Sequence, residues 1–309
     1  MLYVSTRNSA DTFTAYRALH EEYAADGGFY APFHLRAFSE EELSVFKSQP
    51  FAETVAEMLN LFFGLRLTGA DVEFTIGRTP VRTQHLNYNL IMAELWRNPA
   101  GAFDYILQKL YSLITAKNEI KLPNGWTRIA IEIAVLFGIY GILDNDKAQR
   151  FDVAVSTDDF ADITAVLYAK DMGLPVNKII CACNDGSGAW DLVNRGEIAT
   201  AVKAPYLEYL LFRAFGAGET ARHLDACTRN VTYYVSEEQP EVLANELFAA
   251  VVGTNRIDTI TGSMLTTNQY HIDPMTAVAF GGLQDYRAHS GVSANTLILA
   301  KDRPLKAKE

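Results

Sequence analysis

The chain has 309 residues, of which 49% are hydrophobic and 21% are charged, a balance typical of a soluble globular protein. A prior of roughly 150 residues per domain predicts two domains or one large one. The formal net charge of −10 disfavours nucleic acid and anionic membranes as partners, because both carry negative charge themselves.

Residues 1–78 are predicted to form a first domain that is mainly helical. Ser39 and Glu42 have the spacing of a capping box, so a helix is expected to begin after Ser39. A second helix is expected over Phe51–Phe63, where one buried stripe is formed by Val55, Met58, Leu59 and Phe62. The polar segment that follows is predicted to hold a short strand at residues 72–76 and then a linker.

Residues 79–309 are predicted to form a second domain in which strands and helices alternate. A strand at 151–155, a helix at 159–172 and a strand at Val176–Cys183 predict a right-handed parallel crossover. The most apolar segment, 129–143, is too short to span a bilayer and is expected to be a buried helix.

The rest of this domain is predicted to contain three helices and a last strand. The helices are expected near 190–195, over 205–215 and over 237–252, the last of them opened by Ser236 and closed by Gly253. The strand is expected at 296–299.

The cysteines and histidines predict neither disulfides nor a metal site. Cys181, Cys183 and Cys227 are too few for a disulfide framework, so we expect a reducing, cytoplasmic environment. Cys181 and Cys183 alternate onto one face of a strand, which favours core packing. The first twenty residues are polar, and no secretory peptide is expected. No two of the six histidines have the spacing of metal ligands on a helix.

Six motifs follow one another along nearly the whole chain. They lie at residues 3–7 with 24–32, 94–104, 123–128, 157–163 with 168–175, 207–212 and 273–278. In this order they resemble motifs of threonine synthases, which are pyridoxal-phosphate enzymes of fold type II. The resemblance implies an α/β fold, with a threonine-synthase-like N-terminal domain at 1–78. It also implies a reduced parallel-sheet domain, similar to the tryptophan synthase β chain, at 79–309.

The second motif departs from the family at the residue that carries the chemistry. The family reads E-L-[WF]-H-G-P-T-x-A-F-K-D, and its Lys forms the imine with the cofactor. Asp104 stands in that place here, and a carboxylate cannot form an imine. The nearby Lys109, Lys117 and Lys121 are poor substitutes, since Lys109 lies five positions further on and points to another helix face.

The family also has a long stretch between this motif and the next, with a turn G-D-T-G-x-A and most of the small lobe that covers the cofactor. Only residues 105–122 lie between the two motifs here, and no G-D-T-G-like sequence occurs in the chain. The resemblance therefore implies that the small lobe is largely deleted.

Two further cofactor contacts of the family are changed. The phosphate loop G-N-F-G corresponds to Asp158-Asp159-Phe160-Ala161, and a carboxylate about 4 Å from a phosphate costs roughly 4 kcal/mol per pair of charges. Thr157, Asp158 or Asp159 is better interpreted as the N-cap of the next helix. The family's terminal S-T-A-H-P corresponds to residues 300–304, and Lys301 takes the place of the threonine that faces the pyridine nitrogen.

These changes predict a non-catalytic threonine-synthase-like protein that binds no pyridoxal phosphate and keeps a vestigial cleft. It is expected to act by binding a small metabolite, or as a subunit of a homo- or hetero-oligomer, with an authentic threonine synthase as one candidate partner. One alternative is an active enzyme that converts O-phosphohomoserine to threonine and phosphate. The last alternative is a divalent-cation site built from Asp104, Asp158 and Asp159.

Overall fold

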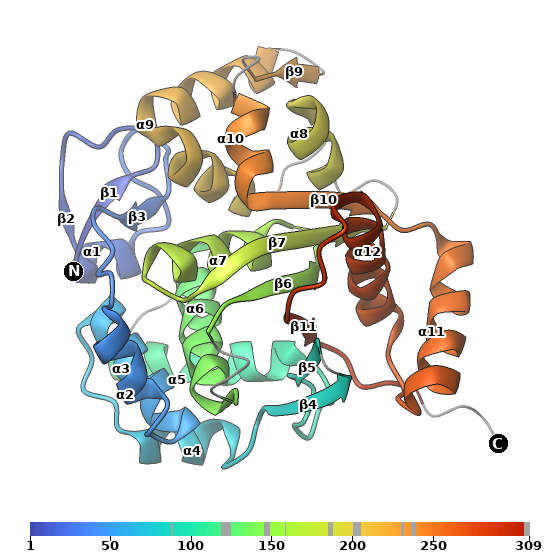
Figure 1. Ribbon diagram of the computed structural model, residues 1–309. Coiled ribbons are helices and arrows are strands. Elements are labelled where there is room, and N and C mark those ends of the chain that lie inside the picture. The colour runs from blue at the N-terminus through green and yellow to red at the C-terminus, as the bar shows by residue number, and fades with distance from the viewer. Residues whose placement is uncertain are drawn as a thin grey trace.

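A six-stranded sheet forms the centre of the molecule (Figure 1). The computed structural model describes residues 1–87, 89–118, 125–144, 149–157, 159–184, 188–199, 205–229, 232–235 and 239–305. The strand order is β10-β7-β6-β11-β5-β4. These strands are Leu247–Val251, Val176–Cys183, Phe151–Ser156, Thr296–Ala300, Leu90–Glu94 and Arg82–Asn87.

The sheet is parallel apart from one strand. β10, β7, β6, β11 and β5 run parallel to their neighbours, and only β4 pairs antiparallel, with β5. The predicted α/β fold with a mainly parallel sheet is confirmed. Because the five parallel strands share one direction, the segments after their carboxyl ends meet at one edge, where ligands bind in open α/β sheets.

Two hydrophobic cores lie on the two faces of this sheet. Side chains of β5 alternate between them, with Ile91 and Ala93 in one core and Leu90 and Met92 in the other. The first core is covered by α5, α6 and α7, at Phe103–Asn118, Gly125–Ile142 and Ala161–Asp171. The second is covered by α11 and α12, at Thr254–Asn268 and Pro274–Ser290. Helices therefore bury both faces, as a parallel sheet requires.

The N-terminal segment combines a small sheet with four helices. β1, β2 and β3, at Leu2–Ser5, Phe13–Thr14 and Tyr30–Pro32, form an antiparallel sheet in the order β2-β1-β3. The helices α1 to α4 are Ala15–His20, Glu40–Phe46, Phe51–Phe63 and Gly69–Ile76. The predicted capping box at Ser39 and the helix Phe51–Phe63 are confirmed. The predicted strand at 72–76 is wrong, because Thr68 and Asp71 form a capping box that starts α4.

The N-terminal segment shares its core with the larger sheet. α3 packs on α6, and residues of both belong to one continuous hydrophobic cluster. The Tyr3 hydroxyl lies between the two parts, donating to the Phe62 carbonyl oxygen at 2.7 Å and accepting from the Trp126 indole at 3.2 Å. A domain boundary after residue 78 stays a prediction.

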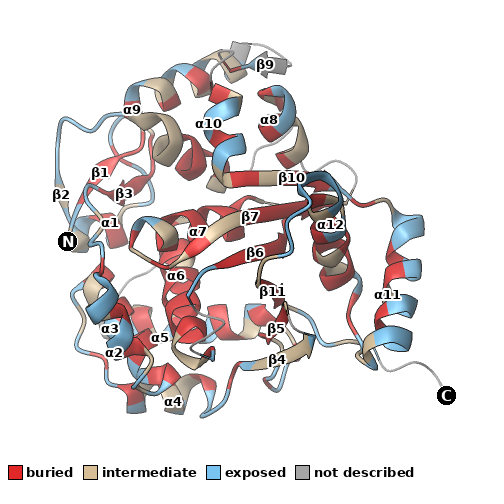
Figure 2. Ribbon diagram, in the orientation of Figure 1, coloured by how far each residue is buried: buried red, intermediate tan, exposed pale blue. Residues whose placement is uncertain are grey.

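Helix α6 is the core helix of the molecule. The expectation that this segment is too short to span a bilayer is wrong, because α6 is long and apolar enough to do so, but 78% of it is buried inside the protein. Figure 2 shows it among the most buried elements. The interpretation of residues 129–143 as a buried helix is confirmed.

The crossover from β6 through α7 to β7 is parallel, as predicted. The long helix predicted at 237–252 is wrong: α10 covers only Gln239–Glu246, and β10 begins at Leu247. Pairing with β7 outweighs the local helical pattern there. The predicted N-cap Ser236 lies outside the described residues.

The remaining elements lie beside α10. They are α8 at Ala189–Arg195, β8 at Glu197–Ala199, α9 at Pro205–Arg229 and β9 at Thr232–Tyr234. β8 and β9 form a two-stranded sheet. α9 is longer than the helix predicted at 205–215, and its backbone is non-helical at Gly216.

Candidate functional site

The segments that follow β5 and β11 are held together by backbone hydrogen bonds. The Phe103 N–H donates to the Lys301 carbonyl oxygen, and the Arg303 N–H donates to the Gly101 carbonyl oxygen, both at 2.8 Å. Gly101 suits this turn because its φ of 71° lies in the left-handed region. The backbone thus brings the start of α5, with Asp104, next to Lys301 and Asp302.

Lys301 forms an ion pair at the carboxyl edge of the sheet. Its ammonium group lies 2.7 Å from Oδ2 of Asp162 and 3.2 Å from the carbonyl oxygen of Ser156. Asp162 is buried in the first turn of α7, and the Lys301 side chain is 21% exposed. Burial lowers the pKa of Lys301, but the Asp162 carboxylate outweighs it, so the pKa is raised and the ammonium form is favoured.

Arg128 connects two more carboxylates to this edge. Its Nε lies 2.8 Å from Oε1 of Glu132, one turn along α6, and its Nη1 lies 2.9 Å from Oδ2 of Asp159. Burial lowers the pKa of Arg128, but these two carboxylates raise it by more. The guanidinium group also lies over the ring of Tyr206, 5.1 Å from its centroid.

Arg128, Glu132, Asp159, Asp162 and Lys301 form what we call the charge network. Burial, and then the neighbouring Asp162, raise the pKa of Glu132 to about 8, although Arg128 and Lys301 oppose the shift. Its Oε2 is buried without a hydrogen-bond partner among the described residues. With Glu132 protonated, the network holds two cations and two anions and is neutral.

The loop before α7 satisfies its own backbone amides. The Phe160 N–H donates to Oγ1 of Thr157 at 3.3 Å, and the Ala161 N–H donates to Oδ1 of Asp159 at 3.0 Å. Phe160 itself is the N-cap residue, with a φ of 68°. The prediction that Thr157 or Asp159 is the N-cap is therefore wrong, although both side chains accept backbone hydrogen bonds in the loop before the helix. Asp158 lies outside the described residues.

Asp104 stands apart from the charge network. It is exposed at the start of α5, and the described residues provide it with no ion pair or hydrogen bond. Partial burial raises the pKa of Asp302, and the carboxylates of Asp273 and Asp104 add to this shift while Lys301 opposes it. Asp104 and Asp302 are thus close enough to interact.

The structure does not assemble the three carboxylates suggested as a cation site. Asp159 is already bound by Arg128, whereas Asp104 belongs to a different helix and Asp158 is not described. Within the described ranges, no three His, Cys, Asp or Glu side chains are grouped so that they could hold a metal ion.

The residues present do not fit pyridoxal phosphate at the three positions that the resemblance assigns to it. Position 104 offers a carboxylate and no amine. The amides of Phe160 and Ala161 already have side-chain acceptors, and Lys301 is bound to Asp162. Sequence reasoning missed Asp162 as the partner of Lys301. The spacing of four between Arg128 and Glu132 was a signal that could have revealed that pair.

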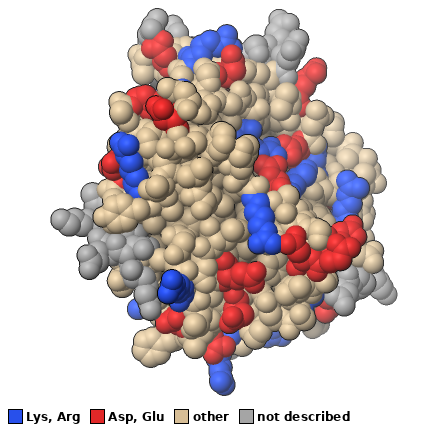
Figure 3. All heavy atoms as spheres, turned by 90° about the vertical axis from the view of Figure 1, so that its left-hand side faces the viewer, with Lys and Arg blue, Asp and Glu red and all other residues tan. Residues whose placement is uncertain are grey.

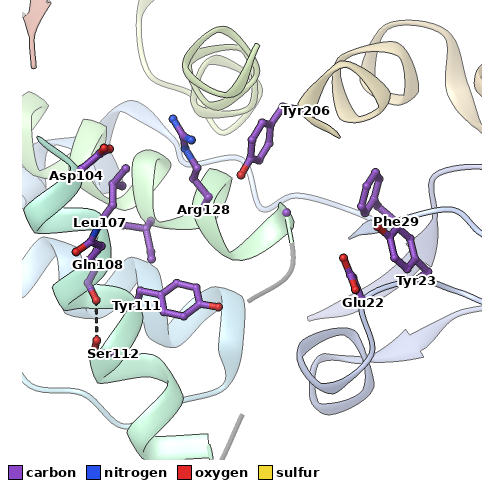
Figure 4. A pocket seen from close by; sticks show the side chains of 12 residues that line it. Glu22, Tyr23, Phe29, Asp104, Leu107, Gln108, Tyr111, Ser112, Arg128 and Tyr206 are labelled. Atoms are coloured by element: carbon purple, nitrogen blue, oxygen red, sulfur yellow. Dashed lines mark hydrogen bonds between the residues drawn. The ribbon is translucent and has the colours of Figure 1, made fainter. Parts of the chain in front are cut away.

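A cleft of about 790 Å³ opens next to Asp104 (Figure 4). Asp104, Gln108 and Tyr111 from α5 lie on one side, and Glu22, Tyr23 and Phe29 from the N-terminal segment lie on the other. Arg128 and Tyr206 lie between the two sides, on α6 and α9. The cleft therefore joins the N-terminal segment to the larger α/β part, a common place for ligands.

Comparison with known proteins confirms the kinship that the motifs predict. Residues 2–79 match the family model described as threonine synthase N terminus. The threonine synthase of Eremothecium gossypii is 27% identical over 167 residues, which are 51% of this chain and 31% of that protein. Threonine synthase-like 2 of Mus musculus is 34% identical over 112 residues, 33% of this chain and 23% of that protein. The matches thus span less than a third of these curated relatives.

Solved structures of threonine synthases share the fold of nearly the whole chain. The pyridoxal-phosphate-bound enzyme from Brucella melitensis has a TM-score of 0.84 at 19% identity, covering 99% of this chain and 89% of that one. The yeast enzyme has a TM-score of 0.76 at 15% identity, covering 97% and 87%. These similarities confirm the threonine-synthase fold.

Proposed function

This chain is a relative of the threonine synthases, and we propose that it is a non-catalytic one that acts by binding. The observation that carries the proposal is the replacement of the imine lysine by Asp104, an exposed acid at the start of α5. No imine forms without a primary amine, so the chemistry that threonine synthases perform has no starting point at this position.

The charge network supports the same proposal. Lys301 is bound to Asp162 and Arg128 is bound to Glu132 and Asp159, so both cations are already paired where the resemblance assigns the cofactor. To admit a phosphate, the loop at 157–161 would have to give up two internal hydrogen bonds. The bond to the Asp159 carboxylate contributes roughly 1.5–3 kcal/mol and the bond to the neutral Thr157 hydroxyl about 1 kcal/mol, so opening the loop is unfavourable. We propose that the protein takes no pyridoxal phosphate.

The test is to incubate the purified protein with pyridoxal phosphate and then reduce it with borohydride. We expect no saturable absorption band and no pyridoxyl group fixed at one site. Phosphate release from O-phosphohomoserine is measured on the same sample, and none is expected. A single lysine modified at one equivalent per chain, together with phosphate release, would establish the alternative of an active threonine synthase.

We also propose that the protein associates with itself or with a partner subunit, such as an authentic threonine synthase. One observation favours this: the large apolar ring of Phe74 on α4 is 95% exposed. On the face seen in Figure 3, acidic and basic side chains are interspersed and the centre is largely uncharged. Light scattering of the protein alone, and mixed with a threonine synthase, is the test. Clean monomers in both samples would contradict the proposal.

A further inference from the structure

The cleft of about 790 Å³ has the size of a small-molecule site, for which volumes of roughly 300–1,000 Å³ are usual. Its walls combine charged and aromatic side chains, and these limit the chemistry of a ligand.

Among the described residues that line the cleft, carboxylates outnumber cations. Arg128 is the one cation that lines it within the described part of the chain, and the Asp159 carboxylate, 2.9 Å away, already neutralises it. The carboxylates of Glu22 and Asp104 also line the cleft, and the structure gives neither of them an ion pair with a described residue. Among the described lining residues, an anionic ligand would meet two carboxylates that have no ion pair and no cation that lacks one. A cationic ligand would gain from both.

The two carboxylates lie on opposite sides of the cleft. Figure 4 shows Asp104 at the end of the α5 side and Glu22 at the other side, next to Tyr23. A ligand with two ammonium groups joined by a chain satisfies one carboxylate at each end.

The space between the carboxylates suits an alkyl chain with positive charge. The aromatic rings of Tyr23, Phe29, Tyr111 and Tyr206 line it, and aromatic faces attract ammonium groups. Leu107 and Ile131 add apolar surface for methylene groups. The Tyr111 hydroxyl is buried and has no hydrogen-bond partner among the described residues, so it offers an acceptor to an N–H donor. Burial raises the pKa of Tyr111 to about 12, which keeps this hydroxyl neutral.

We infer that the cleft binds a linear aliphatic diamine or polyamine, with one ammonium group on Asp104 and another on Glu22. The inference rests on the proposed binding role and specifies its ligand class. Amino acids and phosphorylated amino acids are disfavoured, because their anionic groups would find no unpaired cation among the described residues that line the cleft. The acid that replaces the family lysine thereby gains a role of its own as a ligand contact.

The experiment is titration calorimetry of the full chain with 1,4-diaminobutane and with spermidine, each at low and at physiological salt. 1-Aminobutane, which has one ammonium group, and inorganic phosphate are the comparison probes. We expect saturable binding of the diamine, at least tenfold weaker binding of the monoamine, and no binding of phosphate. Asp104→Asn and Glu22→Gln should each weaken diamine binding about tenfold, the loss expected for one charge-assisted contact.

Asp258→Asn is the matched control, since Asp258 is exposed on α11 and its substitution changes the net charge equally. It should leave binding unchanged. Equal affinity of all three variants would mean that the amine is attracted only by the net charge of the chain, and would overturn the inference. Absence of saturable diamine binding would overturn it too. Neither result affects the proposal of a non-catalytic protein, which fails only if an imine forms or phosphate is released.

Discussion

The ammonium group of Lys301, directly after β11, lies 2.7 Å from the buried carboxylate of Asp162 in the first turn of α7. The two residues are 139 positions apart in the chain, so this ion pair fastens the end of the last strand to the helix that follows β6. The resemblance to threonine synthases assigns the position of Lys301 to a neutral hydroxyl that faces the cofactor ring. A lysine there serves the stability of this chain.

Replacing Lys301 by methionine should lower the free energy of unfolding by roughly 3 kcal/mol, because it leaves the Asp162 carboxylate buried without its cation. Chemical denaturation measures the loss. Lys109→Met, at an exposed position of α5, is the control and should change stability by under about 0.5 kcal/mol. The double variant Lys301→Met with Asp162→Asn should recover part of the loss. If the single variant is as stable as the parent, the ion pair is not a stabilising contact.

Stability should also depend on pH through Glu132. Its pKa is about 8 in the folded protein and 4.5 as the ordinary value, so between these values the folded state binds more protons than the unfolded state. Its contribution is fully present below pH 4.5 and is lost as the pH rises through 8. Glu132→Gln stays neutral, and between pH 5 and pH 9 the free energy of unfolding of this variant relative to the parent should rise by about 4 kcal/mol.

The measurement is the difference in unfolding free energy between the parent and Glu132→Gln at pH 5, 7 and 9. Glu57→Gln, at an exposed position of α3, is the control and should show no such trend. A difference that does not vary with pH would mean that Glu132 titrates equally in both states.

The side chain of Glu208 on α9 should stabilise the N-terminal sheet through hydrogen bonds to the residues that follow β1. Its buried carboxylate accepts hydrogen bonds from the Thr6 hydroxyl and from Nε and Nη2 of Arg7, the latter two at 3.1 and 2.9 Å. Glu208→Gln keeps the shape and removes the charge, so we expect a loss of about 2 kcal/mol. Hydrogen exchange should quicken in β1 and β3 and stay unchanged in β6 and β7. Uniform quickening in all four strands would contradict a local role.

The parts of the fold that could be predicted from the sequence are those fixed by local patterns. The apolar residues of β6, α7 and β7 have clear periodicity, and Gly173 and Pro175 mark the end of the helix. The capping box at Ser39 is a local signal of four residues. β10 was missed because it continues directly from α10, and only its pairing with β7 makes it a strand. Such pairing depends on residues about 70 positions away, which no local window contains.

Of the candidate site, the motif residues could be predicted from the sequence, whereas their partners in space could not. The motifs located Asp104, the loop at 157–161 and Lys301, which the fold does bring to the carboxyl edge of the sheet. The partner of Lys301 was not predictable from a local pattern, since Asp162 meets it only after β6 and β11 have paired. The opposing wall of the cleft was missed for the same reason, because Glu22, Tyr23 and Phe29 come from the other end of the chain.

Asp104→Lys tests whether the missing amine is the only obstacle to cofactor binding. We expect that this variant still fixes no pyridoxal phosphate, for two reasons. The backbone N–H groups of Phe160 and Ala161 still donate to side-chain acceptors, so they are not available to bind the phosphate. The new ammonium group also lies near Asp302, and an opposite charge holds it in the protonated form, whereas an imine requires the neutral amine.

Borohydride reduction after incubation with the cofactor, followed by mass spectrometry of the peptide that contains position 104, gives the answer. Asp258→Lys carries the same change of charge at an exposed site of α11 and sets the level of unspecific modification. The two variants should be modified equally. If Asp104→Lys takes up one equivalent of pyridoxal phosphate per chain and Asp258→Lys does not, the cofactor position is open. The loss of the lysine would then be the only reason why the parent protein binds no cofactor. In that case the charge network is compatible with the cofactor, and only measured diamine binding would support a binding role for the cleft.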